Sequence, residues 1–331
     1  MEFPQSHFKF DPSNFRRFLA VHSDIIQSYS SNPRNLLEKY DKPSRIFICG
    51  MGGSAIVSDL LNIYLAELEI ISVRDYFLPV TVKKDDLVII SSYSGNTEEA
   101  ISCYRNARRI GCQVLIHTSG GKLEETAKQA GIPVIYLPKG YPPRSAVVPS
   151  FFLLLRVFEE LGLVKSKKDD VDRLISYLQK TDFSALSIGL SQKLVGKIPI
   201  IYSSHNYYPI AYRWKTQFNE NAKVAAFSNF FPELNHNELE GFNLENVHVV
   251  MLSFDDDFSR MKKRISNTKN ALTTNSVSVT ELDIKGEKLN KIFSALLLGD
   301  HVSYYLALLL EVDPYPVDVI ERFKRSMGPF I

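Results

Sequence analysis

The stretch RIFICGMGGSA at residues 45–55 is an apolar strand that runs directly into a glycine turn and the start of a helix. The stretch LVIISSYSGNTEE at residues 87–99 repeats this order, with a loop of hydroxyl-bearing and small residues before the helix. Such loops present backbone N–H groups, hydroxyls and a helix N-terminus to an anion. The two stretches therefore favour an α/β fold that holds a phosphorylated small molecule.

Strands and helices alternate on both sides of these two stretches. In the first half, strands are expected at residues 45–49, 69–73, 87–90, 114–118 and 134–137, and helices at about 55–66, 98–110 and 123–129. In the second half, strands are expected at residues 198–203, 247–254 and 276–282, and helices at about 210–218, 258–270 and 289–312. This alternation predicts parallel sheets wound with helices, with ligands at the carboxyl ends of the strands.

The chain is long enough for two domains of ordinary size, since it has 331 residues, of which 45% are hydrophobic. We expect an amphipathic helical segment at residues 1–43 and a first α/β domain at 44–150. A helical connection at residues 151–195 then leads to a second α/β domain at 196–331. The second domain repeats the first as a pattern of elements rather than in sequence.

Composition and charge exclude several classes of protein. The 39 basic and 37 acidic residues leave a net charge of +2, which gives no footprint for nucleic acid. Arg156 and Asp300 interrupt the longest apolar segments, so no membrane span is expected. Cys49, Cys103 and Cys112 have no metal-type spacing and indicate reduced thiols. With no signal peptide at the N-terminus, these features predict a soluble cytoplasmic protein.

The first glycine turn also fits a dinucleotide-binding fingerprint. Gly50, Gly52 and Ala55 have its spacing, and Asp75 follows the next strand. A dinucleotide site, however, does not need the second hydroxyl-rich loop one crossover away. Neither loop ends in the Gly-Lys-Ser/Thr of an ATP-binding loop, so a bound phosphate would serve as a handle that positions the rest of a substrate.

Two polar positions in the second half are candidates for chemistry. Glu220 ends a helix between two asparagines, and His236 lies in a polar loop. Taken alone, each is more often an ordinary surface residue. A metal site of His236, Glu238 and Glu240 lacks a strong ligand spacing, and no metal is expected.

Six motifs, in order, resemble those of the archaeal bifunctional phosphoglucose/phosphomannose isomerases, a family of the phosphoglucose isomerase superfamily. They are GMGGS at residues 50–54, SYSGNTE at 92–98, PRSA at 143–146, NENAK at 219–223, PELNHN at 232–237 and IERFK at 320–324. Together they cover almost the whole chain. The resemblance implies an α/β fold of two doubly wound parallel-sheet sugar isomerase domains in tandem.

The resemblance also implies a role for particular residues. The residues that would hold the sugar phosphate are Gly52, Gly53, Ser54, Ser92, Ser94 and Thr97. Glu220 would be the base, Arg144 would stabilise the developing negative charge, and His236 with Lys324 would serve ring opening. Aldose–ketose isomerisation needs one base to move a proton between C1 and C2 and a cation near the enediolate. No cofactor is implied.

The implied reaction interconverts glucose 6-phosphate and fructose 6-phosphate, and also mannose 6-phosphate and fructose 6-phosphate. The sequence departs from the family at Val317, where a threonine thought to favour mannose phosphate is common. The implied assembly is a homodimer in which His236 of one chain completes the site around Glu220 of the other. The alternatives are a sugar-phosphate sensor without catalysis and a dinucleotide-dependent oxidoreductase.

Overall fold

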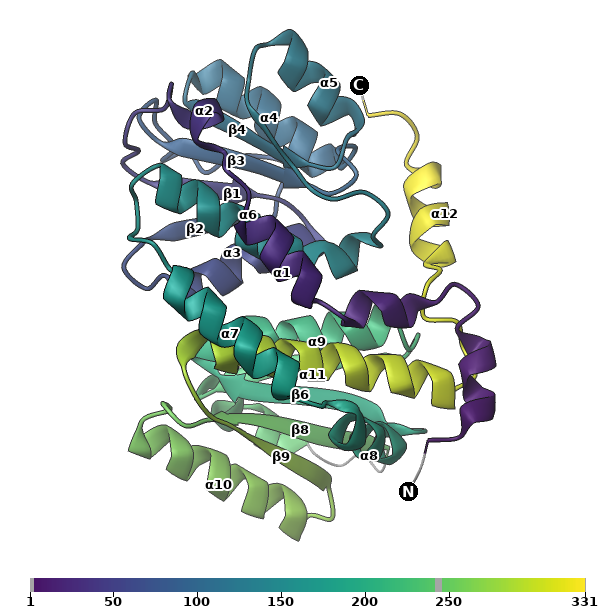
Figure 1. The fold of residues 1–331 in the computed structure, drawn as a ribbon. Helices are drawn as coiled ribbons and strands as arrows, with labels where there is room; N and C mark the ends of the chain where they lie inside the picture. The colour runs from purple at the N-terminus through teal and green to yellow at the C-terminus, as the bar shows by residue number, and fades with distance from the viewer. Residues whose placement is uncertain (1–2, 242–245, 331) are drawn as a thin grey trace. The chain divides into compact units, whose positions relative to one another are not determined.

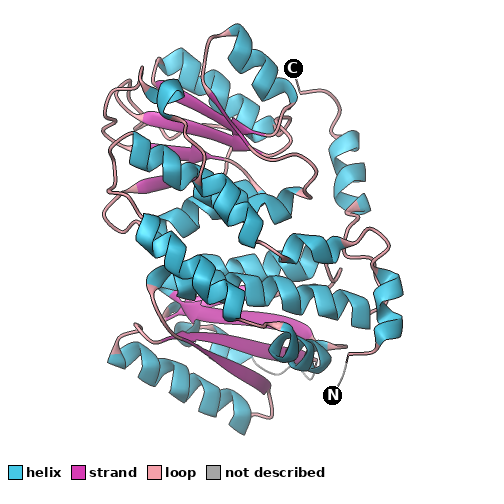
Figure 2. Ribbon diagram, viewed as in Figure 1, coloured by secondary structure: helices cyan, strands magenta, loops and turns pink. Residues whose placement is uncertain are grey.

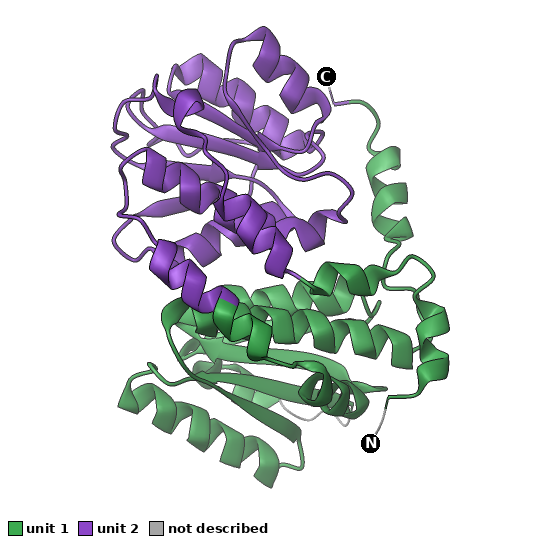
Figure 3. Cartoon of the chain, viewed as in Figure 1, with its two compact units in different colours: residues 1–20, 176–329, 331 green, residues 21–175, 330 purple. Residues whose placement is uncertain are grey.

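The computed structural model describes residues 3–241 and 246–330. Two compact units divide the chain (Figure 3). Unit 2 comprises residues 21–175 with Phe330, and unit 1 comprises residues 1–20 and 176–329 with residue 331. Each unit is built around its own parallel sheet, drawn in magenta in Figure 2. The structure therefore confirms the predicted α/β class with two parallel sheets.

Unit 2 contains a five-stranded sheet in the order β2-β1-β3-β4-β5. Its strands are β1 (Ile46–Cys49), β2 (Ile70–Val73), β3 (Leu87–Ser92), β4 (Gln113–Thr118) and β5 (Val134–Tyr136). Its helices are α1 (His22–Tyr29), α2 (Arg34–Leu37), α3 (Gly52–Tyr64), α4 (Glu98–Ile110), α5 (Gly121–Gln129) and α6 (Val147–Glu160). Strands β1 and β3 are buried throughout, because helices cover both faces of the sheet (Figure 1).

Unit 1 contains a four-stranded parallel sheet in the order β7-β6-β8-β9. Its strands are β6 (Ile198–Ser204), β7 (Phe227–Phe231), β8 (Val247–Phe254) and β9 (Ser278–Ile284). Its helices are α8 (Ser184–Leu194), α9 (Tyr208–Glu220), α10 (Ser259–Thr274), α11 (Lys288–Leu309) and α12 (Asp318–Ser326), and α7 (Lys168–Lys180) spans the division between the units. Helices α9 and α11 cover one face of this sheet and α10 covers the other (Figure 1).

Helix α11 is the one helix in the described part of the chain that is long and apolar enough to cross a membrane. Of its most apolar window, 89% is buried inside the fold. Among its contacts, the carbonyl of Ala295 accepts a hydrogen bond from the indole of Trp214 on α9 at 2.8 Å. These features identify α11 as a core helix of unit 1.

Most of the predicted elements are confirmed to within a few residues, and two differences have local causes. Strand β7 was not predicted, because FSNFF is a half-buried edge strand with polar residues in its middle. Helix α8 lies within the stretch at residues 151–195 that was expected to be helical. The segment at residues 1–43 contains the short 3₁₀ turns η1 (Gln5–Phe10) and η2 (Phe15–Leu19) before α1 and α2, since prolines interrupt any longer helix.

In both sheets the chain reverses its direction of strand addition beside the first strand. In unit 2 this switch point lies between β1 and β3, and in unit 1 it lies between β6 and β8. The carboxyl-end crevice at a switch point is the usual ligand site of a doubly wound sheet. In unit 1 the crevice carries Asp255 and Asp256, and the ammonium of Lys291 pairs with them at 2.8 Å and 2.7 Å. In unit 2 it carries the two glycine loops.

Candidate functional site

The two loops of unit 2 are in direct contact at the switch point. A side-chain Cβ on Gly50, at the end of β1, would lie 2.6 Å from the carbonyl oxygen of Ser91 on β3. Only glycine allows the backbones to approach so closely. The turn into α3 and the turn into α4 therefore open side by side, and both helix N-termini face the same crevice.

The first loop also packs against the segment that carries Arg144. A Cβ on Gly53 would lie 3.2 Å from the carbonyl oxygen of Pro143. Pro143 and Arg144 belong to the 3₁₀ turn η3 (Pro143–Ala146), and Arg144 is 3% exposed. A guanidinium stays protonated even when buried. The structure thus packs the backbone of η3, which carries Arg144, against Gly53 at the start of α3.

The second loop contains a preformed set of hydrogen bonds among its hydroxyls. Ser92 Oγ and Thr97 Oγ1 lie 2.8 Å apart, and the N–H of Gly95 donates to Ser92 Oγ at 3.2 Å. Ser94 Oγ accepts from the N–H of Asn96 at 3.2 Å. Thr97 is the N-cap of α4. The loop therefore gathers hydroxyls and free helix-end N–H groups around one position, an arrangement suited to a phosphate.

A buried histidine supports the strand that leads into this loop. His117 on β4 is opposite Ser91 on β3, and its Nδ1 lies 3.1 Å from Ser91 Oγ. Complete burial disfavours the charged imidazolium and lowers the pKa of His117 to about 3. The ring is therefore neutral at physiological pH and acts as a structural partner of Ser91.

Glu220 is the last residue of α9, where its neighbours fix the turn. The side chain of Asn221 is buried and donates to Ser303 Oγ on α11 at 3.0 Å. Asn219 donates to the carbonyl of Val224 at 2.8 Å. The two asparagines that flank Glu220 thus tie the end of α9 to the turn that follows it and to α11.

Lys223 joins this turn to the chain before α12. It has a left-handed backbone, with φ of 60°, and its ammonium donates to the carbonyl of Glu220. The same ammonium donates to the carbonyl of Pro316 at 2.6 Å. Val317 follows as the N-cap of α12, on which Lys324 is exposed and pairs with Glu321 at 2.7 Å.

Buried polar contacts hold α9 in place on α11. Asp300 on α11 accepts from Arg213 at 3.1 Å and from Gln217 at 2.7 Å, both on α9. Breaking a buried ion pair leaves an unpaired charge and is strongly destabilising. Since Arg213 lies about two turns and Gln217 about one turn before Glu220, this network sets the position of the carboxylate-bearing end of the helix.

His236 lies near the carboxyl ends of the strands in the sheet of unit 1. It ends the 3₁₀ turn η5 (Glu233–His236), which follows the carboxyl end of β7, and its side chain is exposed. Helix α9 starts after the carboxyl end of β6 and runs back along the sheet for 13 residues, about 18 Å. Glu220, at its end, therefore lies near the amino ends of the strands. Within one chain, therefore, unit 1 does not bring Glu220 and His236 together.

Glu238 has a structural role beside His236. It accepts hydrogen bonds from the hydroxyl of Tyr202 and, at 2.6 Å, from the amide of Asn229. In the described part of the chain, no three His, Cys, Asp or Glu residues gather as metal ligands would. Sequence reasoning did not single out Lys223, His117 or Asn221, although the first and last of these lie within the NENAK motif.

Comparisons with known proteins identify relatives of this chain. A family model described as the bacterial phospho-glucose isomerase C-terminal SIS domain matches residues 184–327. A bifunctional phosphoglucose/phosphomannose isomerase of Caldicellulosiruptor bescii is 38% identical over 309 residues, which cover 88% of this chain and 91% of the relative.

A second relative and a solved structure extend the comparison. The protein of the same description from Thermoplasma volcanium is 38% identical over 298 residues, covering 88% of this chain and 92% of the relative. The C-terminal domain of glucosamine-fructose-6-phosphate aminotransferase from Francisella tularensis superimposes with a TM-score of 0.70 at 15% identity, covering 91% of this chain and 98% of that one. At that identity the structure supports the fold alone.

Proposed function

Because the chain belongs to the bifunctional phosphoglucose/phosphomannose isomerase family, we infer that it is an aldose–ketose isomerase. It interconverts glucose 6-phosphate with fructose 6-phosphate and mannose 6-phosphate with fructose 6-phosphate. The observation that carries this function is the 38% identity to such an isomerase over 88% of the chain. The paired loops at the switch point of unit 2 supply the phosphate site that these substrates need.

The sugar phosphate is held by the loops after β1 and β3. The proposed contacts are Gly52, Gly53, Ser54, Ser92, Ser94 and Thr97. This assignment is supported by the contact between Gly50 and Ser91 and by the 2.8 Å spacing of the Ser92 and Thr97 hydroxyls. Helix N-termini and hydroxyls can bind a dianion without an ATP-type lysine.

The reaction needs one proton to move between C1 and C2 of the open-chain sugar. Glu220 takes the proton from C2 of the aldose to give an enediolate with its negative charge on O1, a proton passes from O2 to O1, and the proton on Glu220 returns to C1 to give the ketose. Arg144 stabilises the negative charge on the enediolate oxygen. His236 and Lys324 exchange the protons that open and close the ring. No redox cofactor or metal takes part in these steps.

The active assembly is proposed to be a homodimer in which each site draws Glu220 from one chain and His236 from its partner. Support comes from the topology of unit 1, where the two residues lie at opposite edges of one sheet. A two-fold axis makes the two shared sites equivalent.

Free Cys49, Cys103 and Cys112 fit a reducing compartment, which supports the cytoplasm as the location.

The test is to incubate purified protein with fructose 6-phosphate in D₂O and identify the products by NMR. We expect glucose 6-phosphate and mannose 6-phosphate, each carrying deuterium at C2. A sensor would bind the sugar phosphate without forming either product. Conversion that required added NAD or NADP would favour the oxidoreductase alternative instead.

A further inference from the structure

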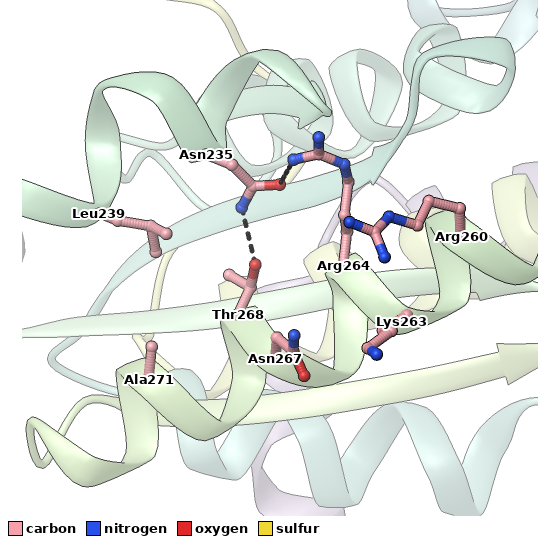
Figure 4. A pocket seen from close by; sticks show the side chains of 8 residues that line it. All are labelled: Asn235, Leu239, Arg260, Lys263, Arg264, Asn267, Thr268 and Ala271. Carbon is pink, nitrogen blue, oxygen red and sulfur yellow. Dashed lines mark hydrogen bonds between the residues drawn. The ribbon is translucent and has the colours of Figure 1, made fainter.

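A groove on unit 1 lies between α10 and the turns that follow β7. Its volume is about 500 Å³, in the usual range for a small-molecule site. Figure 4 shows the residues that line it, which are Asn235, Leu239, Arg260, Lys263, Arg264, Asn267, Thr268 and Ala271. Those on α10 recur every three or four residues, so they form one face of the helix over about three turns.

One end of this groove is positively charged. Arg260, Lys263 and Arg264 line it, and its described lining contains no carboxylate. Neither Arg260 nor Lys263 has an ion-pair partner within residues 3–241 and 246–330. Cations on other faces of the helix are engaged, since Lys262 donates to a backbone carbonyl and Lys269 pairs with a carboxylate. The charge in the groove is therefore not neutralised by the described protein, and it favours an anion.

The other end of the groove is uncharged. Leu239 and Ala271 provide apolar surface there, and Asn267 and Thr268 provide polar atoms between the two ends. Arg260 and Ala271 are separated by about 16 Å along the helix. A ligand that fills the groove would thus carry its negative charge at one end and an uncharged group at the other.

We propose that this groove binds a phosphorylated small molecule with two or more negative charges. Its phosphates contact Arg260, Lys263 and Arg264, and its uncharged part lies against Leu239 and Ala271. Arginine forms bidentate hydrogen bonds to phosphate, and lysine adds a point charge. This site is separate from the sugar-phosphate loops, which belong to unit 2.

Contacts inside the groove connect it to the turn that bears His236. The carbonyl of the Asn235 side chain accepts from Arg264 at 3.3 Å, and its amide donates to Thr268 Oγ1 at 2.8 Å. A phosphate on Arg264 competes with Asn235 for the guanidinium. Ligand binding therefore weakens the contact between Arg264 and Asn235 that holds η5 against α10, and it shifts the position of His236 at the end of η5. This coupling rests on the proposed role of His236, whereas the binding site itself does not.

The binding test is isothermal titration calorimetry on the full-length protein with ADP and with inorganic pyrophosphate. In the double variant R260E/K263E both should bind at least about tenfold more weakly, because two phosphate contacts become repulsive. Lys262→Glu makes the same kind of charge change outside the groove lining and should leave both affinities within about twofold. ADP should bind more tightly than pyrophosphate, because it also fills the uncharged end.

Two further results distinguish the groove from other sites. The double variant S92A/T97A should keep its affinity for ADP, since it alters only the sugar-phosphate loops. Affinity lost in S92A/T97A but kept in R260E/K263E would overturn the proposal, as would the absence of saturable binding of both probes. Displacement of ADP by a DNA or RNA oligonucleotide at lower concentration than by pyrophosphate would assign the groove to nucleic acid and also overturn it.

The coupling to His236 is tested by turnover. Saturating ADP should change kcat or KM for fructose 6-phosphate in the wild type and in Lys262→Glu, but not in R260E/K263E, whose basal turnover should match the wild type. Unchanged turnover at saturation would refute the coupling, while the calorimetry still reports on the groove. If the protein had no isomerase activity at all, the binding test would remain decisive by itself.

Discussion

The ammonium of Lys223 lies 2.6 Å from the carbonyl oxygen of Pro316, so one side chain joins the end of α9 to the chain that leads into α12. The same ammonium also binds the carbonyl of Glu220. The backbone of the proposed base is thus fixed by a residue only three positions away. Lys223 acts here as a positioning residue through these two bonds to backbone carbonyls.

Lys223→Met should lower kcat about tenfold, because a general base displaced by a fraction of an ångström loses its alignment with C1 and C2. KM should change little, since the phosphate loops are in the other unit. Lys215→Met, on an earlier turn of α9, is the matched control. Steady-state kinetics with fructose 6-phosphate measure both parameters. An equal loss in the two variants would mean that removing any cation from α9 is harmful.

Glu220→Gln should reduce turnover of every substrate about a hundredfold to ten-thousandfold, the usual cost of losing a positioned base. Binding of fructose 6-phosphate, measured by calorimetry, should be nearly intact, because the amide keeps the shape of the side chain. Glu240→Gln makes the same chemical change at an exposed position and should be silent. A Glu220→Gln enzyme with more than half of the wild-type turnover would exclude this residue as the base.

The double change S92A/T97A should mainly raise KM for fructose 6-phosphate. In the proposed site the two hydroxyls contact a phosphate that does not react, so they would stabilise ground and transition states alike. Thr126→Ala, on the exposed surface of α5, provides a control for the loss of a hydroxyl. An unchanged KM would place the phosphate elsewhere.

Mixed dimers test whether His236 acts across the subunit interface. Glu220→Gln and His236→Ala proteins should each be inactive, and co-refolding them should restore about a quarter of wild-type activity, because about half of the dimers are mixed and have one intact site in two. Subunit exchange is verified by native mass spectrometry with a tag on one variant. Mixtures that exchange subunits yet stay inactive would place both residues in the same chain's site.

Acid should destabilise unit 2 through His117. The pKa of His117 is about 3 in the folded chain, against 6.5 for an ordinary histidine. Between pH 6.5 and pH 3, the unfolded chain therefore binds a proton at this residue that the folded chain does not bind. Stability is therefore complete above pH 6.5 and falls toward pH 3, by about 3 kcal/mol at pH 4.5. Urea unfolding at pH 7 and at pH 4.5, followed by circular dichroism, measures this loss in the free energy of unfolding.

His117→Gln should be less stable than the wild type at pH 7 but should lose less stability on acidification. His205→Gln, at an exposed position, should keep the wild-type pH dependence. If His117→Gln and the wild type lost the same free energy of unfolding between pH 7 and 4.5, the buried imidazole would not be the acid-sensitive group.

Local pattern was enough to predict the sheets and their loops. The apolar runs at residues 46–49 and 87–90 pair with each other as parts of the neighbouring strands β1 and β3, and the glycines between strand and helix indicated the position of the crevice. Strand β7 was missed because it is a half-buried edge strand whose middle residues, Ser228 and Asn229, are polar. Glu220 and His236 lie at opposite ends of the strands because of the direction in which α9 runs along the sheet. No sequence motif predicts that direction.

The groove on α10 shows a second limit of the sequence. Four of five residues at 260–264 are basic, but the nearly balanced total charge conceals this local excess. These basic residues form part of a groove only together with Asn235 and Leu239. The fold brings those two residues to α10 when η5 and the turn after it pack against the helix.

The two switch-point crevices have opposite preferences for charge. In unit 1, Asp255 and Asp256 already hold Lys291, and carboxylates at that position repel a second anion. We therefore propose the crevice of unit 2, and not that of unit 1, as the phosphate site. The two crevices share one architecture but differ in charge, so the repetition of the sheet does not repeat the ligand site.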